Sequence, residues 1–132
     1  MQIERELKFR LSPASVRSVW RLARFVARPR QKQIVSVYYD TPGARLRRSG
    51  AALRLRREGG RWLQTLKAEA GPQAGLAARA EWELAAPGRR LDLGAFPRES
   101  IMAATGLDLR SLGRGLKPLF ETRFTRRAGI ID

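Results

Sequence analysis

Acidic and basic side chains alternate with mostly apolar residues at the start of the chain. In the segment IERELKFRL, residues 3–11, the even positions are Glu4, Glu6, Lys8 and Arg10. Alternation with a period of two is typical of a β-strand with two different faces. Two carboxylates followed by two cations suit a site where the acids hold a metal ion and the bases contact an anion bridged by that metal.

Four later segments repeat this division into an apolar face and a charged or polar face. Their polar positions are Arg54 and Arg56 in 51–60, Thr65 and Lys67 in 61–70, Arg79, Glu81 and Glu83 in 78–87, and Glu121, Arg123, Thr125 and Arg127 in 118–127. Any one of these strands, taken alone, is explained by half-exposure on a protein surface. Their repetition favours a curved sheet or barrel whose charged faces line a shared interior, with the apolar faces packed outward against helices.

The elements that must position these residues follow from periodicity and turn signals. A helix is predicted over 13–27, because Ser12 is a good N-cap and Pro13 suits the first turn. Its apolar stripe is expected to pack in the core, and comprises Val16, Val19, Trp20, Ala23 and Val26. Further predictions are loops at 28–31 and 71–77, a strand at 33–42, a hairpin turn at 58–61 and a short helix at 97–105.

Composition restricts the available chemistry. A chain of 132 residues is expected to form one domain, 1–132, and it contains no Cys and no His. Disulfides, thiolate or imidazole ligands and a histidine base are therefore excluded. Any metal would be a hard cation held by carboxylates, such as Mg²⁺ or Mn²⁺. No apolar run has the length of a membrane helix and no signal peptide is evident, which predicts a cytoplasmic protein without a membrane partner.

The net charge implies a polyanionic partner. The chain has 27 Lys and Arg against 12 Asp and Glu, a net charge of +15. A preference for Arg codons explains part of this excess, so the positions of the charges matter more than their number. Nucleic-acid binding predicts aromatic residues among exposed basic ones. In the predicted strands, the aromatic residues lie on the face opposite the charged ones, so no specific nucleic-acid partner is expected. These aromatic residues are Trp62, Trp82, Phe120 and Phe124.

Several segments resemble those of the CYTH, or triphosphate tunnel metalloenzyme, superfamily. ERELK at 4–8 matches its ExExK motif, and later segments follow in the same order: VYYDTP at 37–42, LRRSGAALRLRREGGRWLQTLK at 46–67, RAEWEL at 79–84 and PLFETRFTRR at 118–127. The resemblance covers essentially the whole chain. It implies an α+β fold in which an antiparallel β tunnel or barrel has a charged interior and helices packed outside.

The resemblance also implies roles for individual residues. The carboxylates expected to bind metal and support catalysis are Glu4, Glu6, Glu81 and Glu83, with the last two as ligands of a second metal or as groups that orient water. The cations expected to bind phosphate are Lys8, Arg54, Arg56, Lys67, Arg79, Arg123 and Arg126. At the last position strand parity favours Arg127, whereas motif alignment favours Arg126. Any one of these residues could instead form a surface salt bridge.

The activity implied by the resemblance is metal-dependent hydrolysis of inorganic tripolyphosphate to pyrophosphate and phosphate. Adenylyl cyclase, thiamine triphosphatase and a non-catalytic polyphosphate-binding module are the alternatives. The resemblance to bacterial members suggests a C-terminal CHAD-like domain in a longer protein. The family's tunnel continues past the basic strand with further strands, including an acidic one. We therefore expect this chain to be the N-terminal portion of the domain, with an open tunnel.

Overall fold

The computed structural model describes residues 1–69 and 79–132, except for the side chains of Gln2 and Glu4. The loop expected at 71–77 lies outside the described residues. Six strands form one antiparallel sheet in the order β1-β5-β4-β3-β2-β6. They are β1 (Gln2–Glu4), β2 (Arg30–Asp40), β3 (Ala51–Glu58), β4 (Arg61–Glu69), β5 (Arg79–Ala85) and β6 (Lys117–Ala128).

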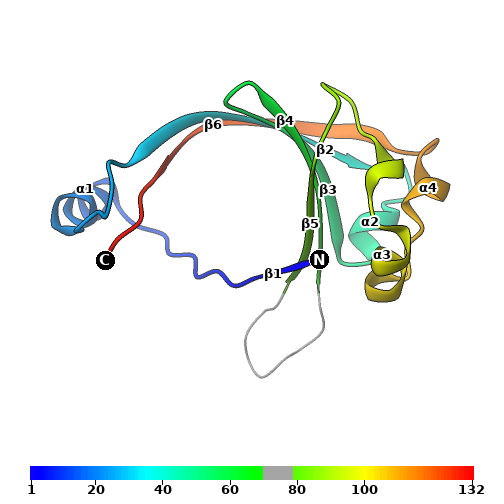
Figure 1. Ribbon diagram of the computed structural model, residues 1–132, viewed down its shortest axis with the longest axis horizontal. Helices are drawn as coiled ribbons and strands as arrows, with labels where there is room; N and C mark the ends of the chain where they lie inside the picture. The colour runs from blue at the N-terminus through cyan, green and yellow to red at the C-terminus, as the bar shows by residue number, and fades with distance from the viewer. Residues whose placement is uncertain (70–78) are drawn as a thin grey trace.

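The sheet curves into an arch, and the segment after β1 passes beneath its open side (Figure 1). Because β1 and β6 are its two edges, the sheet is not closed within the described part of the chain. The predicted α+β class and antiparallel architecture are confirmed, with the tunnel open along one side. No described helix is long and apolar enough to cross a membrane.

The hairpin between β3 and β4 has the predicted turn. Glu58 pairs with Arg61, and the two residues between them, Gly59 and Gly60, have φ of 56° and 79°. Positive φ at both central positions is the requirement of a type I′ turn, which glycine meets without steric cost. The turn sets the register that places alternate residues of β3 and β4 on the same faces.

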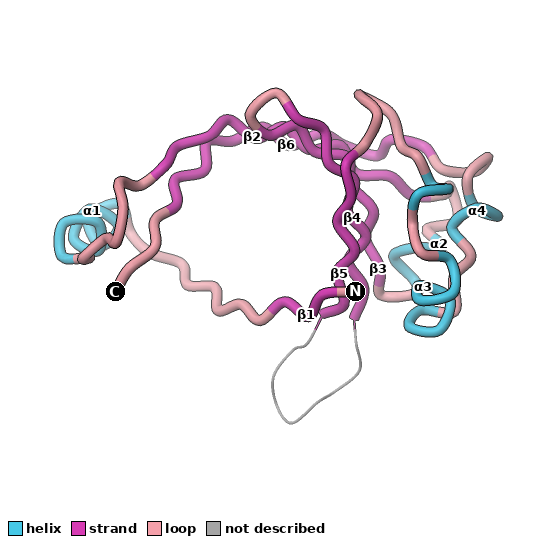
Figure 2. Tube along the Cα trace, viewed as in Figure 1, coloured by secondary structure: helices cyan, strands magenta, loops and turns pink. Residues whose placement is uncertain are grey.

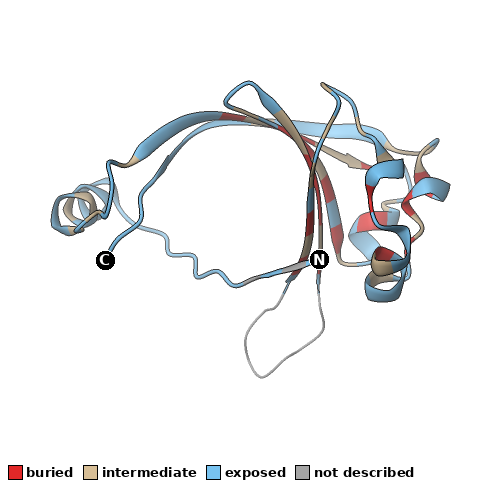
Figure 3. Cartoon of the chain, in the orientation of Figure 1, coloured by how far each residue is buried: buried red, intermediate tan, exposed pale blue. Residues whose placement is uncertain are grey.

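The hydrophobic core lies on the convex side of the arch. Leu53 and Leu66 are fully buried there, together with Trp82 of β5. They pack under four short helices, α2 (Arg45–Arg48), η1 (Leu93–Ala95), α3 (Arg98–Thr105) and α4 (Leu109–Leu112). Figure 3 shows the buried positions concentrated between these helices and the sheet. The predicted helix at 97–105 is confirmed as α3, and the other three were not predicted.

Asp40 connects the sheet to this helical layer. Its Oδ1 accepts hydrogen bonds from the backbone N–H groups of Thr41, at 2.7 Å, and Leu46, at 3.0 Å, and its Oδ2 accepts one from Arg47 at 3.1 Å. The side chain is 4% exposed, so the carboxylate satisfies backbone donors that would otherwise be buried without partners. Asp40 therefore fixes the turn that leads from β2 into α2.

The first helix begins at the predicted residue but ends at Leu22 rather than at residue 27, and its predicted packing is wrong. In α1 (Pro13–Leu22) the Ser12 side chain caps the first turn, yet no residue of the helix is buried and Val19 is 52% exposed. The helix lies at the far end of β2 and β6, away from the core (Figure 1). The Trp20 ring instead stacks on the Phe25 ring, with the two ring centroids 5.0 Å apart. The Arg127 guanidinium lies 4.2 Å from the Trp20 ring centroid.

Strand lengths also differ from prediction at two places. β2 begins at Arg30, inside the expected loop at 28–31, and residues 30–33 pair with 125–128 beyond the end of β3. We call this two-stranded extension the arm. Conversely, β1 ends at Glu4, and residues 5–12 are a loop rather than a strand (Figure 2).

Candidate active site

The register of the strands determines which side chains share the concave face. Residues paired directly across antiparallel strands project to the same side of the sheet. One set of such pairs runs across the sheet: Thr122 with Ser36, Ser36 with Arg56, Arg54 with Thr65, Thr65 with Glu83, and Lys67 with Glu81. Charges of both signs from β3, β4 and β5 are thereby brought to one surface.

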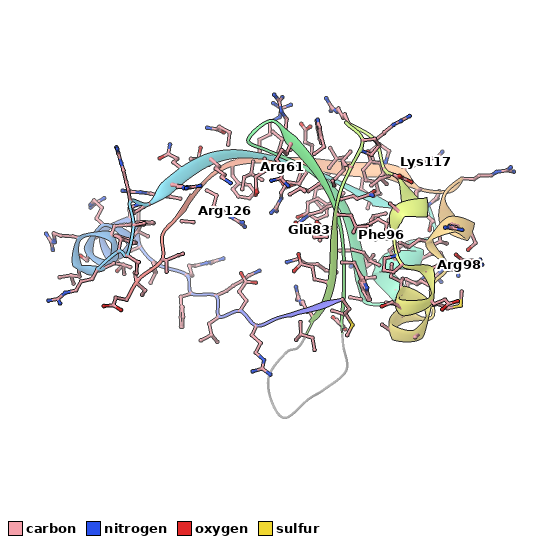
Figure 4. All side chains as sticks on the ribbon, viewed as in Figure 1. Arg61, Glu83, Phe96, Arg98, Lys117 and Arg126 are labelled. Atoms are coloured by element: carbon pink, nitrogen blue, oxygen red, sulfur yellow. The ribbon has the colours of Figure 1, made fainter. Side chains whose placement is uncertain are left out.

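This surface contains a cavity of about 460 Å³, which we call the active-site cavity. The segment after β1 contributes Glu6 and Lys8, and strands β2 to β6 contribute Tyr38, Arg54, Arg56, Glu58, Lys67, Glu81, Glu83, Thr122, Phe124 and Arg126. Figure 4 shows Glu83 and Arg126 extending from different strands into the space under the arch. The lining combines a cluster of cations with several carboxylates.

Arg56 is the most buried cation of the cavity. Its side chain is 6% exposed, and its Nε donates a hydrogen bond to Ser36 Oγ at 2.9 Å. Burial is the main cause that lowers the Arg56 pKa, and the positive charges of Arg54 and Arg126 lower it further, against smaller opposing effects of Tyr38 and Glu58. A guanidinium stays protonated in proteins, so this site retains clustered positive charge that an anion would neutralise.

Arg54 carries a second indication of a ligand. Its Nε is buried and has no hydrogen-bond partner among the residues that the structure describes. Leaving a buried donor without a partner costs about 1–3 kcal/mol, and native structures rarely leave such a group unexplained. Because the same side chain lines the cavity, an oxygen of a bound anion would supply the missing acceptor.

The carboxylates of the cavity are held by neighbouring polar groups. Glu83 Oε1 accepts a hydrogen bond from the Thr65 hydroxyl at 3.2 Å. Glu6 pairs with Lys8 at 3.5 Å, and both side chains are largely exposed, so this pair adds little stability. Among the side chains that the structure describes, no three acidic groups lie close enough to coordinate one metal ion. The side chain of Glu4 is not among them.

Eight of the predicted site residues line this one cavity: Glu6, Lys8, Arg54, Arg56, Lys67, Glu81, Glu83 and Arg126. The structure does not bring Arg79 or Arg123 into the described lining. Arg79 is exposed at the start of β5, in register with Glu4. Arg123 donates from Nε to Glu121 at 2.9 Å on an exposed surface, and the phosphate contact expected for it stays a prediction.

The prediction of which face of β6 turns toward the cavity is wrong. The alternation was right, but Thr122, Phe124 and Arg126 face the cavity, and Arg127 lies against Trp20 instead. The physical reason is the pairing with β2, in which Ser36 opposes Thr122 and thereby sets the inward face. The aromatic Phe124 consequently lies among the charges, contrary to the separation expected from sequence.

Sequence reasoning missed several residues of the lining. Glu58 follows Arg54 and Arg56 at the same parity, so the alternation of β3 already contained the signal for it. Tyr38 stacks on Phe120, with ring centroids 4.8 Å apart, and also lines the cavity. For Thr122 and Phe124 no signal was available without the register of β6.

Comparison with known proteins now adds to this geometry. A sequence profile of the CYTH domain matches residues 2–130. The chain belongs to the CYTH family. Among solved structures it is similar to HpAC1 from Hippeastrum, assigned as an adenylyl cyclase and described as having a dominant triphosphatase activity, with a TM-score of 0.61 and 15% identity. It is also similar to the PH1819 protein from Pyrococcus horikoshii OT3, with a TM-score of 0.55 and 20% identity.

These two CYTH-like neighbours are longer than this chain. The matches cover 90% and 89% of this chain but only 62% and 58% of HpAC1 and PH1819. At such identities the likeness shows a shared fold. This chain therefore spans about three fifths of the length of each neighbour.

Proposed function

We propose that this CYTH chain binds a linear triphosphate in the active-site cavity and hydrolyses it with a divalent metal. The observation that carries the proposal is the clustering of Arg54, Arg56 and Arg126 around the same cavity as Glu81 and Glu83. CYTH-family membership supports action on a triphosphate, and the dominant triphosphatase activity described for HpAC1 is the reason to propose hydrolysis rather than cyclisation. Inorganic tripolyphosphate is the simplest substrate that satisfies this chemistry.

The cations account for recognition of the phosphates. Guanidinium groups present donors in a planar fork that matches phosphate oxygens, and charge-assisted hydrogen bonds of this kind are strong. Arg54 offers an Nε that has no partner in the described part of the chain, and Arg56 is already held in place by its hydrogen bond to Ser36. Lys8 and Lys67 approach from the segment after β1 and from β4, so a bound chain of phosphates would be contacted from several sides.

The donor chemistry of the cavity suits a hard divalent metal. CYTH triphosphate tunnel metalloenzymes use divalent metals, and carboxylate oxygens are the ligands that such ions prefer. Mg²⁺ is commonly held by one or two carboxylates together with substrate phosphates and water, so a described cluster of three acids is not required. Glu6 and Glu81 would hold the ion, and its role when bound would be to neutralise phosphate charge.

The remaining chemistry is assigned to residues of the chain itself. Hydrolysis requires a water oxygen to attack the terminal phosphorus while the phosphoanhydride bond breaks and pyrophosphate leaves. We assign Glu83, oriented by the Thr65 hydroxyl, to position this water and accept its proton. Arg54, Arg56 and Arg126 would stabilise negative charge on the phosphates during transfer. A cytoplasmic location and a CHAD-like partner domain stay predictions.

Two arginines on the same strand provide a matched test of this proposal. Arg126 lines the cavity, whereas Arg123, three residues earlier, lies outside its described lining. Arg126→Gln should weaken tripolyphosphate binding, measured by titration calorimetry, about tenfold, and Arg123→Gln should change it less than twofold. Equal effects of the two substitutions would mean that binding follows net charge and would reject the proposed cavity.

A further inference from the structure

The edge of the sheet at β6 is long and exposed. β6 runs beside β2 along the arch (Figure 1), and no described strand pairs with its other side. Every residue of β6 is exposed except Thr122, which is half-buried. The backbone N–H and C=O groups of an unpaired edge are a template for pairing with another strand, and proteins commonly protect such edges. This edge is therefore a candidate interaction surface.

The sequence in the middle of β6 is complementary to itself. Residues 120–124 read Phe-Glu-Thr-Arg-Phe. If two copies pair as antiparallel strands about a twofold axis at Thr122, Phe120 of one copy lies opposite Phe124 of the other, and Glu121 lies opposite Arg123. Symmetry produces each of these contacts twice. Aromatic side chains thus meet aromatic ones, and acidic side chains meet basic ones.

The two faces of β6 agree with this register. Phe120 stacks on Tyr38 and Phe124 lines the active-site cavity, so both rings belong to the concave face. Glu121 and Arg123 project to the opposite face, where Arg123 Nε donates to Glu121 Oε2 at 2.9 Å. Residues directly opposed in antiparallel strands share a face, and this register opposes only residues of the same face. The two sheets would therefore join with their concave faces on the same side.

The exposed aromatic rings show what such pairing would cover. Phe120 is 54% exposed and Phe124 is 40% exposed. Aromatic pairs across antiparallel strands stabilise a sheet, and burial of their apolar surface favours association. Two copies would bring four of these rings together around the axis.

The neighbouring registers lack this complementarity. An axis at Glu121 would oppose two carboxylates, and an axis at Arg123 would oppose two guanidinium groups. Like charges directly opposite each other destabilise an antiparallel pair. An axis between two residues would oppose Glu121 to Thr122 or Phe124, and the concave face of one sheet would continue into the convex face of the other. The charges therefore favour the axis at Thr122.

We propose that β6 is an interface between two copies of this chain, which pair edge to edge with the twofold axis at Thr122. A second copy is the occupant because both the aromatic and the charged residues of this edge are complementary to themselves. Thr122 and Phe124 line the active-site cavity, so the strand of the second copy would extend the wall beside it. The specific contacts are confined to residues 120–124, so we expect a small interface and a dimer that dissociates on dilution.

Charge reversal on either side of the axis tests this pairing. Glu121→Arg would oppose cations across the axis, and Arg123→Glu would oppose carboxylates. Each should weaken dimerisation at least about tenfold, measured by sedimentation velocity over a range of protein concentrations. Salt at physiological concentration screens the long-range repulsion between two positively charged chains. Arg57→Glu, at an exposed position of β3, is the matched control and should dimerise like the unaltered chain; circular dichroism establishes folding.

The two single variants also provide a test that restores binding. In an equimolar mixture, the cations of Glu121→Arg would face the carboxylates of Arg123→Glu. A mixed dimer should therefore form, although each variant alone stays largely monomeric. The double variant Glu121→Arg/Arg123→Glu exchanges the two charges and should regain the affinity of the unaltered chain within about threefold.

Cross-linking tests the register itself, because the chain has no Cys. Thr122→Cys places two thiols at the axis, where opposed Cα atoms are about 4.5–5.5 Å apart, within the range of a disulfide. Thr125→Cys is the control, because its Cα atoms in the two copies would be about 20 Å apart, six times the rise per residue. On a non-reducing gel after mild oxidation, Thr122→Cys should cross-link at least about tenfold faster than Thr125→Cys.

Several results would overturn the inference. An unaltered chain that stayed monomeric at the highest concentration would reject the dimer. A mixture of the single variants that formed no dimer, or a control that dissociated as readily as they do, would reject the charge pairing across the axis. Equal rates of cross-linking would reject the register, and assembly beyond the dimer would show unspecific edge pairing. These measurements need no phosphate ligand, so the inference can fail while the proposed function stands.

Discussion

The convex and concave faces of the sheet are made by alternate residues of the same strands, yet their physical environments differ completely. On the convex face of β3, Leu53 and Leu55 are fully buried. On the concave face of the same strand, Arg54 has a buried donor that no described residue satisfies, and Arg56 is buried beside two other guanidinium groups. Burial of apolar groups stabilises the fold, whereas burial of unpaired cations opposes it. The convex face therefore maintains the structure that keeps the concave face ready for an anion.

The largest effect should come from removing a side chain of the convex face. Leu53→Ala should lower the free energy of unfolding by about 2–5 kcal/mol, because it leaves a cavity in the packed core. Chemical denaturation monitored by circular dichroism measures this loss. Leu119→Ala, at a position 57% exposed, is the control and should change stability by no more than about 0.5 kcal/mol. Similar losses in the two variants would contradict the placement of the core.

On the concave face, the same kind of substitution should affect binding instead of stability. Arg56→Met keeps much of the side-chain volume but removes a buried charge that Arg54 and Arg126 repel. Tripolyphosphate affinity should fall by about 1.5–3 kcal/mol, as expected for a lost charge-assisted hydrogen bond. Unfolding free energy should stay level or rise.

A matched substitution on the opposite face separates these effects. Arg57 follows Arg56 in β3 but is exposed. Arg57→Met should leave tripolyphosphate affinity within twofold, as measured by the same titration. If Arg56→Met destabilised the chain as strongly as Leu53→Ala, the concave face would be part of the structural core and the comparison between the faces would fail.

The arm provides a third region, which should respond separately from the core. Gly129→Ala places a β-carbon against the Phe25 ring and should cost about 1–3 kcal/mol of local stability, as overpacking commonly does. Hydrogen exchange should show faster exchange of the Val26 amide, whose hydrogen bond to Ile130 closes the tip. Gly88→Ala is the control, because no described atom beyond its chain neighbours lies within 4 Å of an added β-carbon there. Unchanged protection of Val26 would contradict the close contact at the tip.

The smallest expected effect is on the pH dependence of stability, through an ion pair in the helical layer. The hydrogen bond from Arg98 to Asp108, at 2.6 Å, is the main cause that lowers the Asp108 pKa. A carboxyl group whose pKa is lower in the folded than in the unfolded chain stabilises the fold above its unfolded pKa, and this contribution is lost as the pH falls through the folded pKa. Thermal unfolding of Asp108→Asn should therefore vary less between neutral and acidic pH than that of the unaltered chain. An identical pH dependence in both would remove Asp108 from this role.

The sequence predicted best where the two faces of a strand differ strongly. In β3 the apolar and charged residues alternate without exception from Leu53 to Arg56, and the structure separates them as expected. Parity shows which residues share a face, but it does not show which face turns inward. In β6, an edge strand, both faces are partly exposed, and only pairing with β2 brings Arg126 rather than Arg123 to the cavity.

Two other segments show the same limit. The apolar stripe of α1 predicted a helix correctly, but an amphipathic pattern does not identify what the helix packs against, and here the arm carries α1 away from the core. Alternation after β1 predicted that Glu6 and Lys8 would face the same site, which they do, although regular strand pairing ends at Glu4. Pairing between strands that are distant in the sequence decides where α1 lies and where β1 ends, and local periodicity does not show this pairing.

Release of phosphate from tripolyphosphate in the presence of Mg²⁺ or Mn²⁺ tests the central claim most directly. The unaltered chain should show metal-dependent turnover. Glu83→Gln should lower turnover at least about a hundredfold while retaining tripolyphosphate affinity, because it removes the proton acceptor and no cation. Glu121→Gln, on the exposed surface beside Arg123, should leave turnover unchanged. Equal turnover in Glu83→Gln and Glu121→Gln, or no turnover in the folded unaltered chain, would contradict the proposed catalytic role of the cavity.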